Sequence, residues 1–147
     1  MSDTDISVLN GLIKTTLDSM KGYEDAAKDA ESTQFATMFA DFARDRAQVA
    51  TKLQNQVRTL GGEPELDSSM LAAAHRTFMD LKQAITGKDD KAIINEVERG
   101  EDHIKAKYED AMKDTDVSPA TQAVIKDGFA SVREGHDKMR ALKHSIA

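Results

Sequence analysis

Apolar residues recur at every third or fourth position through four long stretches of this chain of 147 residues. That spacing is typical of an α-helix with one buried face, because an α-helix completes a turn in about 3.6 residues. Little interrupts the pattern, since the chain contains only two prolines and eight glycines. The sequence therefore predicts an all-α protein in which long helices bury their apolar faces against one another.

Residues that start or stop helices divide the pattern into five predicted elements. Ser32 provides capping chemistry, while Gly61 and Gly87 are predicted C-terminal stops. Ser118 is a predicted N-cap, because Pro119 behind it suits the first position of a helix. The first two predicted helices cover about residues 4–31 and the residues from the break at Ser32 to about 60. The other three cover about residues 69–86, 89–114 and 119–145.

The lengths of the connections predict how the helices are arranged. Very short turns join the first two long helices and the last two, so each pair is expected to form an antiparallel hairpin. A long segment that contains the short 69–86 helix joins the two hairpins. This pattern predicts a ferritin-like four-helix bundle with one long crossover, as a single domain over residues 1–147. The alternative is a five-helix up-down array in which the short helix is a full member.

Four charged or polar residues fall on apolar helix faces or at their edges, where apolar side chains are expected. They are Glu24, Arg46, Glu101 and His136, one on each long helix. Under the crossover topology all four lie at a similar depth from one end of the bundle, so we expect them to form one polar layer. Gly100 removes a side chain beside Glu101, and we expect it to let a neighbouring helix approach.

Several motifs resemble a known family. The stretches "LGGEPE", "HRTFMDLKQAITGKDD" and "NEVERGED" are similar to those of a bacterial ferritin-like four-helix-bundle family known only as a domain of unknown function. The resemblance extends over nearly the whole chain. It implies a ferritin-like fold distantly akin to rubrerythrins, and it implies no established activity.

A ferritin-like fold raises the question of a di-iron site. Such a site takes one glutamate from each of two helices and a Glu-x-x-His motif from each of the other two. Glu24 on the first helix and Glu101 on the fourth could serve as the single glutamates, with Glu98 as an alternative to Glu101.

The two Glu-x-x-His motifs are not present. His136 lies on the last helix, but Arg133 stands three residues earlier where a glutamate is required. On the second helix Arg46 stands where an inward histidine is expected. Too few ligands remain, and the sequence argues against a classical di-iron centre.

Two interpretations of the polar layer stay open. The favoured one is a buried network in which Arg46 pairs with Glu24 and Glu101, with His136 beside them, because a buried charge is tolerated only when it is paired. That network indicates a non-enzymatic module that is stress-associated or binds a protein partner. The other interpretation is a single iron, manganese or zinc ion held by Glu24, Glu101 and His136, in a metal-binding or ferroxidase-type protein. We expect His75 near the mouth of the layer to be a packing residue rather than a ligand.

Composition argues against several other functions. The chain has no cysteine, which excludes disulfides, thiol catalysis and thiolate zinc sites. Its formal net charge is -6 without a visible basic patch, so we expect no nucleic-acid partner. No apolar run approaches the roughly 18 residues of a membrane span, and the first residues do not resemble a signal peptide. We therefore expect a cytoplasmic protein, and its residual apolar helix surface is compatible with a homodimer.

Overall fold

The computed structural model describes residues 2–66 and 90–146 of the chain. Four α-helices form this part, and no strand occurs in it, which confirms the all-α prediction. They match the four long helices predicted from the apolar spacing to within a few residues. The predicted short helix over 69–86 and His75 lie outside the described residues. The helices are α1 (Ser2–Asp29), α2 (Thr33–Thr59), α4 (Asp90–Met112) and α5 (Pro119–Ile146).

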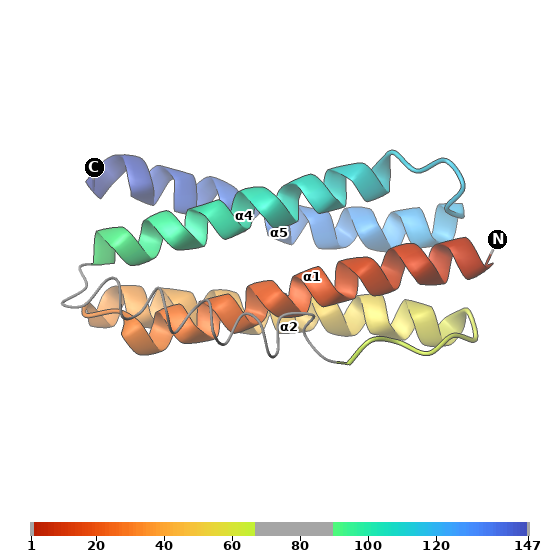
Figure 1. Ribbon diagram of the computed structural model, residues 1–147, viewed down its shortest axis with the longest axis horizontal. Coiled ribbons are helices and arrows are strands. Elements are labelled where there is room, and N and C mark those ends of the chain that lie inside the picture. Colours follow the sequence, from red (N-terminus) through yellow and green to blue (C-terminus); the bar gives the residue numbers. More distant parts are fainter. Residues whose placement is uncertain (1, 67–89, 147) are drawn as a thin grey trace.

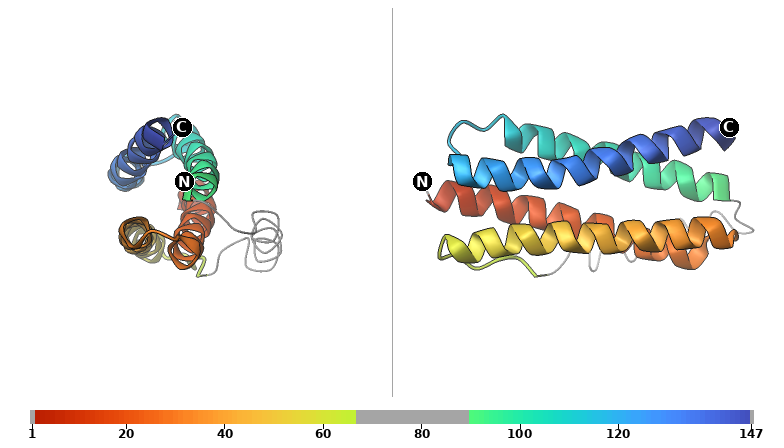
Figure 2. Two further views of the ribbon diagram at one scale, coloured as in Figure 1. Left: turned by 90° about the vertical axis from the view of Figure 1, so that its left-hand side faces the viewer. Right: turned by 180° about the vertical axis from the view of Figure 1, so that it is seen from behind.

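The four helices lie side by side along one long axis (Figure 1). α1 packs against α2 and α4 packs against α5, and each pair is an antiparallel hairpin with a short turn, as predicted. Contacts between α1 and α4 and between α2 and α5 bring the two hairpins together. The end view in Figure 2 shows the helices at the four corners of a bundle.

The two hairpins run in a defined direction relative to each other. α2 ends at the end of the bundle opposite to the one where α4 begins, so α2 and α4 point the same way (Figure 1). This arrangement is compatible with a ferritin-like bundle. The residues that connect α2 to α4 include those outside the described part of the chain.

Two groups of buried apolar side chains fill the bundle, one toward each end. One group contains Leu9, Ile13, Leu53, Ile104 and Ile125 together with their neighbours. The other surrounds aromatic and aliphatic side chains: Tyr23, Phe39, Ile94 and Met139. The predicted polar residues of α2, α4 and α5 fall between these two groups along their helices.

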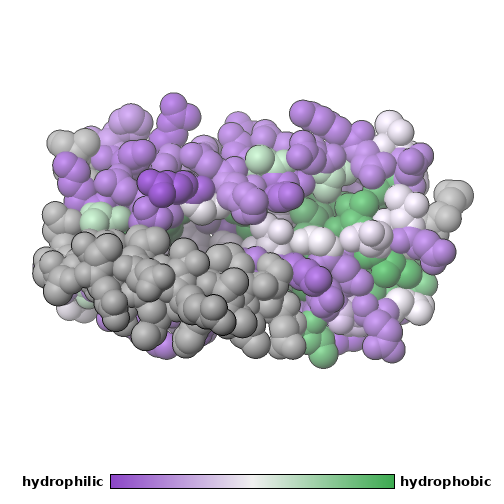
Figure 3. Space-filling view, in the orientation of Figure 1, coloured by the Kyte–Doolittle hydropathy of each residue, from purple (hydrophilic) through white to green (hydrophobic). Residues whose placement is uncertain are grey.

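The surface is hydrophilic over most of the face that carries α4, and apolar residues appear mainly toward the end that holds the chain's N-terminus (Figure 3). None of the described helices combines the length and the apolar character that crossing a bilayer requires. Most large apolar side chains of these helices are instead buried in the core between the helices.

An aspartate joins the two hairpins at each end of the bundle. At one end Asp5 of α1 accepts hydrogen bonds from the backbone N–H and the hydroxyl of Ser118, at 3.0 and 2.5 Å, and from the hydroxyl of Thr121 at 3.0 Å. At the other end Asp90 accepts the backbone N–H groups of Glu31 and Ser32, at 2.8 and 3.1 Å. These contacts connect the start of α1 to the start of α5, and the start of α4 to the α1–α2 turn.

Candidate functional site

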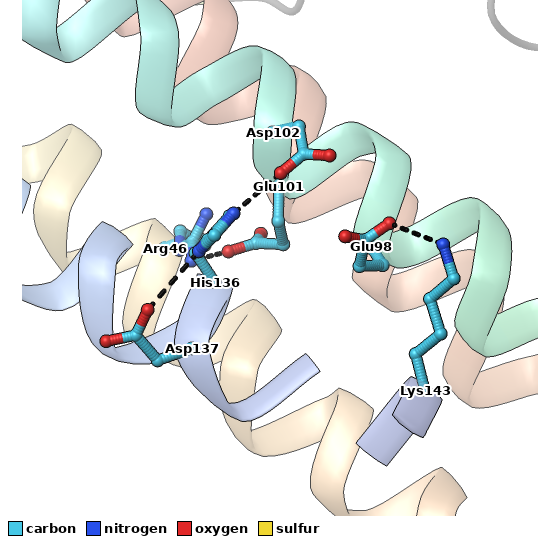
Figure 4. Close-up of polar contacts among 7 residues, drawn as sticks. All are labelled: Arg46, Glu98, Glu101, Asp102, His136, Asp137 and Lys143. Atoms are coloured by element: carbon cyan, nitrogen blue, oxygen red, sulfur yellow. Dashed lines mark hydrogen bonds and ion pairs between the residues drawn. The ribbon is translucent and has the colours of Figure 1, made fainter. Parts of the chain in front are cut away.

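A buried ion pair joins α2 to α4 in the middle of the bundle (Figure 4). Nη2 of Arg46 donates a hydrogen bond to Oε2 of Glu101 at 2.7 Å. The exposed fractions of the two side chains are 0% and 2%. Nη1 of Arg46 also donates to Oγ of Ser19 on α1, at 2.9 Å. The structure therefore brings Arg46 and Glu101 together, and it adds Ser19, a small polar residue that the sequence reasoning missed.

The electrostatics of the pair favour a permanent charge on Arg46. Burial by itself lowers the pKa of Arg46, but the Glu101 carboxylate, together with smaller contributions from Tyr23 and Tyr108, outweighs this effect and raises the pKa above its ordinary value. Nε of Arg46 has no hydrogen-bond partner among the described residues. The guanidinium lies over the ring of Tyr23, with Cζ 5.5 Å from the ring centroid, which is a cation–π arrangement.

Tyr23 of α1 packs beside the pair within a small aromatic group. Its ring stacks on Phe42 of α2 at a centroid distance of 5.2 Å and lies 6.2 Å from Phe39. Its hydroxyl is buried and makes no hydrogen bond of regular geometry within the described part of the chain, but it lies close enough to the Glu101 carboxylate to interact with it. Burial, followed by the negative charge of Glu101, raises the pKa of Tyr23 well above its ordinary value. The phenol therefore stays protonated at neutral pH.

Gly135 of α5 makes room for the ion pair. A Cβ atom at this position would collide with Nη2 of Arg46 and would lie 3.0 Å from Oε2 of Glu101. Gly100, which we predicted to have this role, is exposed, and a Cβ there would meet nothing within 4 Å. The prediction for Gly100 is wrong because successive helical residues point about 100° apart, so Gly100 faces solvent when Glu101 faces the core.

His136 is buried on α5 and contacts aspartates rather than the ion pair (Figure 4). Its Nε2 lies 2.6 Å from Oδ1 of Asp102 on α4, and its Nδ1 lies 3.3 Å from Oδ1 of Asp137. Both aspartate side chains are more than half exposed, at 57% and 63%. His136 therefore links α4 to α5 at the edge of the bundle. The sequence reasoning missed both aspartates because they lie outside the apolar faces.

The two remaining candidate glutamates lie away from the buried pair. Glu24 is exposed on α1, because its neighbour Tyr23 takes the inward position and the next residue along a helix then points outward. It is therefore not part of the buried network that we predicted. Glu98 of α4 is partly buried, and its Oε2 accepts a hydrogen bond from Nζ of Lys143 on α5 at 3.3 Å.

The predicted metal ligands do not converge on one point. Glu101 contacts the guanidinium of Arg46, His136 contacts two aspartates, and Glu24 is exposed. Among residues 2–66 and 90–146, no three His, Asp or Glu side chains are grouped so that they could hold a metal ion. The residues present at the centre of the bundle therefore do not fit a metal of the ferritin-like kind.

Comparison with known protein families gives a match. The model of a family described as a domain of unknown function, DUF2383, matches residues 4–114. This range includes Arg46 and Glu101 and ends in the turn before α5. No curated protein matches the chain.

Proposed function

The chain belongs to the family described as a domain of unknown function, DUF2383, and from the geometry of its centre we propose that it is a non-enzymatic helical module that binds a protein partner. In this proposal the bundle has a ferritin-like organisation. The Arg46–Glu101 ion pair stands where the ligands of a ferritin-like metal site would meet. In this proposal the module acts through its surface, and the ion pair at its centre has a structural role only.

The observation that carries the proposal is the complete burial of Arg46 at 2.7 Å from Glu101. An arginine keeps its positive charge throughout the physiological pH range. A metal cation at Glu101 would therefore lie beside a fixed positive charge, which it repels. Gly135 supports the same conclusion, because the absence of its side chain leaves space for the guanidinium.

The alternative function is metal binding or oxidation at a single iron, manganese or zinc ion. It requires Glu24, Glu101 and His136 to turn toward one point and Arg46 to leave its place against Glu101. The contacts of these side chains favour the ion pair instead.

Element analysis of the protein, purified without chelator and then supplied with Fe²⁺, Mn²⁺ or Zn²⁺, tests this choice. We expect well below one ion per chain for the wild type, for Glu101→Gln, and for Glu109→Gln as a control on the same helix. One ion per chain in the wild type and the control, lost in Glu101→Gln and in His136→Ala, would overturn the proposal.

A further inference from the structure

A groove runs between α2 and α5, which lie next to each other in the rear view of Figure 2. Its volume is about 530 Å³, and its walls are residues 34–45 of α2 and 131–142 of α5. Each wall is about 16 Å long, or three helical turns, at a rise of about 1.5 Å per residue. We call it the α2–α5 groove.

The floor of the α2–α5 groove is apolar. Phe35, Met38 and Phe42 of α2 and Leu142 of α5 line it, and all four are only partly buried. Phe42 also stacks on Tyr23, so the floor rests on the aromatic group beside the ion pair. An apolar surface of this length, open along one side, suits the apolar face of a helix.

The rim of the same groove is acidic. Asp41 and Asp45 of α2 and Glu134 of α5 line it, and Lys138 is the one cationic side chain among the described lining residues. Asp41 also forms an ion pair with Arg44 of the same helix, so the three acids still outnumber the two cations. Nζ of Lys138 lies over the ring of Phe42, 5.7 Å from the centroid. The groove therefore combines an apolar floor with a net negative rim, and a lysine already covers part of that floor.

We propose that the α2–α5 groove binds a cationic amphipathic helix of a partner protein. Apolar side chains at positions i, i+3, i+4 and i+7 of that helix would contact the floor, as in other helix-in-groove complexes. Lysines or arginines that flank this stripe would face the acidic rim, which speeds association and disfavours acidic partners. A second copy of this chain is disfavoured as the occupant, because both copies carry a formal net charge of -6. The inference rests on the proposed function and names the chemistry of the partner.

The probe is a peptide of about 14 residues, or four helical turns. It carries leucines at the helical spacing and lysines at the other positions. Fluorescence anisotropy of the labelled peptide at about 150 mM salt, where long-range charge effects are screened, measures its affinity. Asp41→Lys/Glu134→Lys reverses two exposed charges of the rim. Asp110→Lys/Asp116→Lys reverses two exposed charges outside the groove and changes the net charge equally. We expect at least about tenfold weaker binding for the rim variant and less than about twofold for the control.

One further measurement separates docking from simple charge attraction, and a second tests the role of Lys138. A peptide of the same composition with its leucines scattered around the helix should bind at least about tenfold more weakly, because it presents no apolar stripe. Lys138→Gln should bind the first peptide more tightly, because docking no longer displaces a cation from Phe42 and because the rim loses a positive charge.

Equal weakening in the rim and control variants would overturn the inference, as would equal binding of the scattered peptide. Backbone amide shifts mapped by NMR to helices other than α2 and α5 would also overturn it. These outcomes are distinct from a failure of the ion-pair proposal, because metal content is measured without the peptide.

Discussion

At the scale of single residues, two buried tyrosines differ in one hydrogen bond. The hydroxyl of Tyr108 shares a hydrogen bond of 2.6 Å with the hydroxyl of Thr16, whereas the hydroxyl of Tyr23 makes no hydrogen bond of regular geometry in the described residues and interacts only with the nearby Glu101 carboxylate. Burial raises the pKa of Tyr108 to about 12, even though the hydrogen bond to Thr16 acts in the opposite direction. Both rings are almost completely buried, so the two hydroxyl groups can be compared directly.

Removing each hydroxyl should therefore have different effects. We expect Tyr108→Phe to lower the free energy of unfolding by about 0.5–1.5 kcal/mol, because it loses a buried hydrogen bond. Thr16 keeps its second contact, to the backbone oxygen of Leu12 at 2.7 Å, which limits the cost. Tyr23→Phe should cost less than Tyr108→Phe, because the Tyr23 hydroxyl makes no hydrogen bond of regular geometry and has only the nearby Glu101 carboxylate as a weaker contact. Urea unfolding of the two variants measures the difference, and equal losses would mean that Tyr23 has a hydrogen-bond partner.

At the scale of the helical elements, α5 approaches its neighbours through two glycines. A Cβ at Gly128 would lie 3.1 Å from a methyl group of Val49 and 3.2 Å from the ring of Tyr108. A Cβ at Gly135 would collide with the guanidinium of Arg46. The two glycines are seven residues apart, which places them on the same face of the helix. This face of α5 contacts side chains of both α2 and α4.

Alanine substitutions at two glycines test this packing. We expect Gly135→Ala to lower the free energy of unfolding by about 1–3 kcal/mol, because the methyl group overpacks the buried pair. Gly100→Ala lies on an exposed helix surface with open space around it, so it should raise stability by about 0.5–1 kcal/mol. Thermal unfolding of both variants measures the difference. A stabilised Gly135→Ala would show that the ion pair lies farther from α5.

The helices and the ion pair were predictable because both follow from helical spacing. The apolar period is strong over four long stretches, and Arg46 and Glu101 lie well inside their apolar faces. Glu24 lies at the edge of its apolar face, where a small rotation of the helix decides between core and solvent. The partners of His136 could not be predicted, because Asp102 and Asp137 fall outside the apolar faces. Contacts between helices decide such positions, and the spacing within one helix does not contain that information.

At the scale of the whole molecule, contacts between residues far apart in the sequence connect the two hairpins at both ends of the bundle. Asp5 and Asp90 accept hydrogen bonds from partners on the other hairpin. Burial raises the pKa of Asp5, but the hydrogen bonds from Ser118 and Thr121 outweigh this effect and leave the pKa below its ordinary value of 3.8. The ionised carboxylate is thus the form that holds α1 against α5.

Asp5→Ala should lower the free energy of unfolding by about 1–2 kcal/mol at pH 7, because it leaves donors of Ser118 and Thr121 without their acceptor. The contribution of Asp5 is present above pH 3.8 and is lost as the pH falls through its lower folded-state pKa. The loss in free energy of unfolding caused by Asp5→Ala should therefore be constant from about pH 5 to 7 and become smaller below about pH 4. Asp3→Ala, which removes an exposed acid from the same helical turn, is the control for helix-dipole effects. A loss in free energy of unfolding that does not depend on pH, or that equals the loss in Asp3→Ala, would contradict the role of the Asp5 carboxylate in holding α1 against α5.

Because Gly135 contacts the ion pair, the residue that each of three helices can accept at this place depends on the residues of the other two as sequences diverge in evolution. A side chain at position 135 collides with Arg46, and a smaller residue at position 46 leaves Glu101 unpaired and opens a cavity beside the glycine. Single substitutions at positions 46, 101 and 135 are therefore each penalised, whereas a coordinated set can restore a well-packed core. Among related sequences we expect these three positions to co-vary, so a metal-binding centre at this place would need several replacements together.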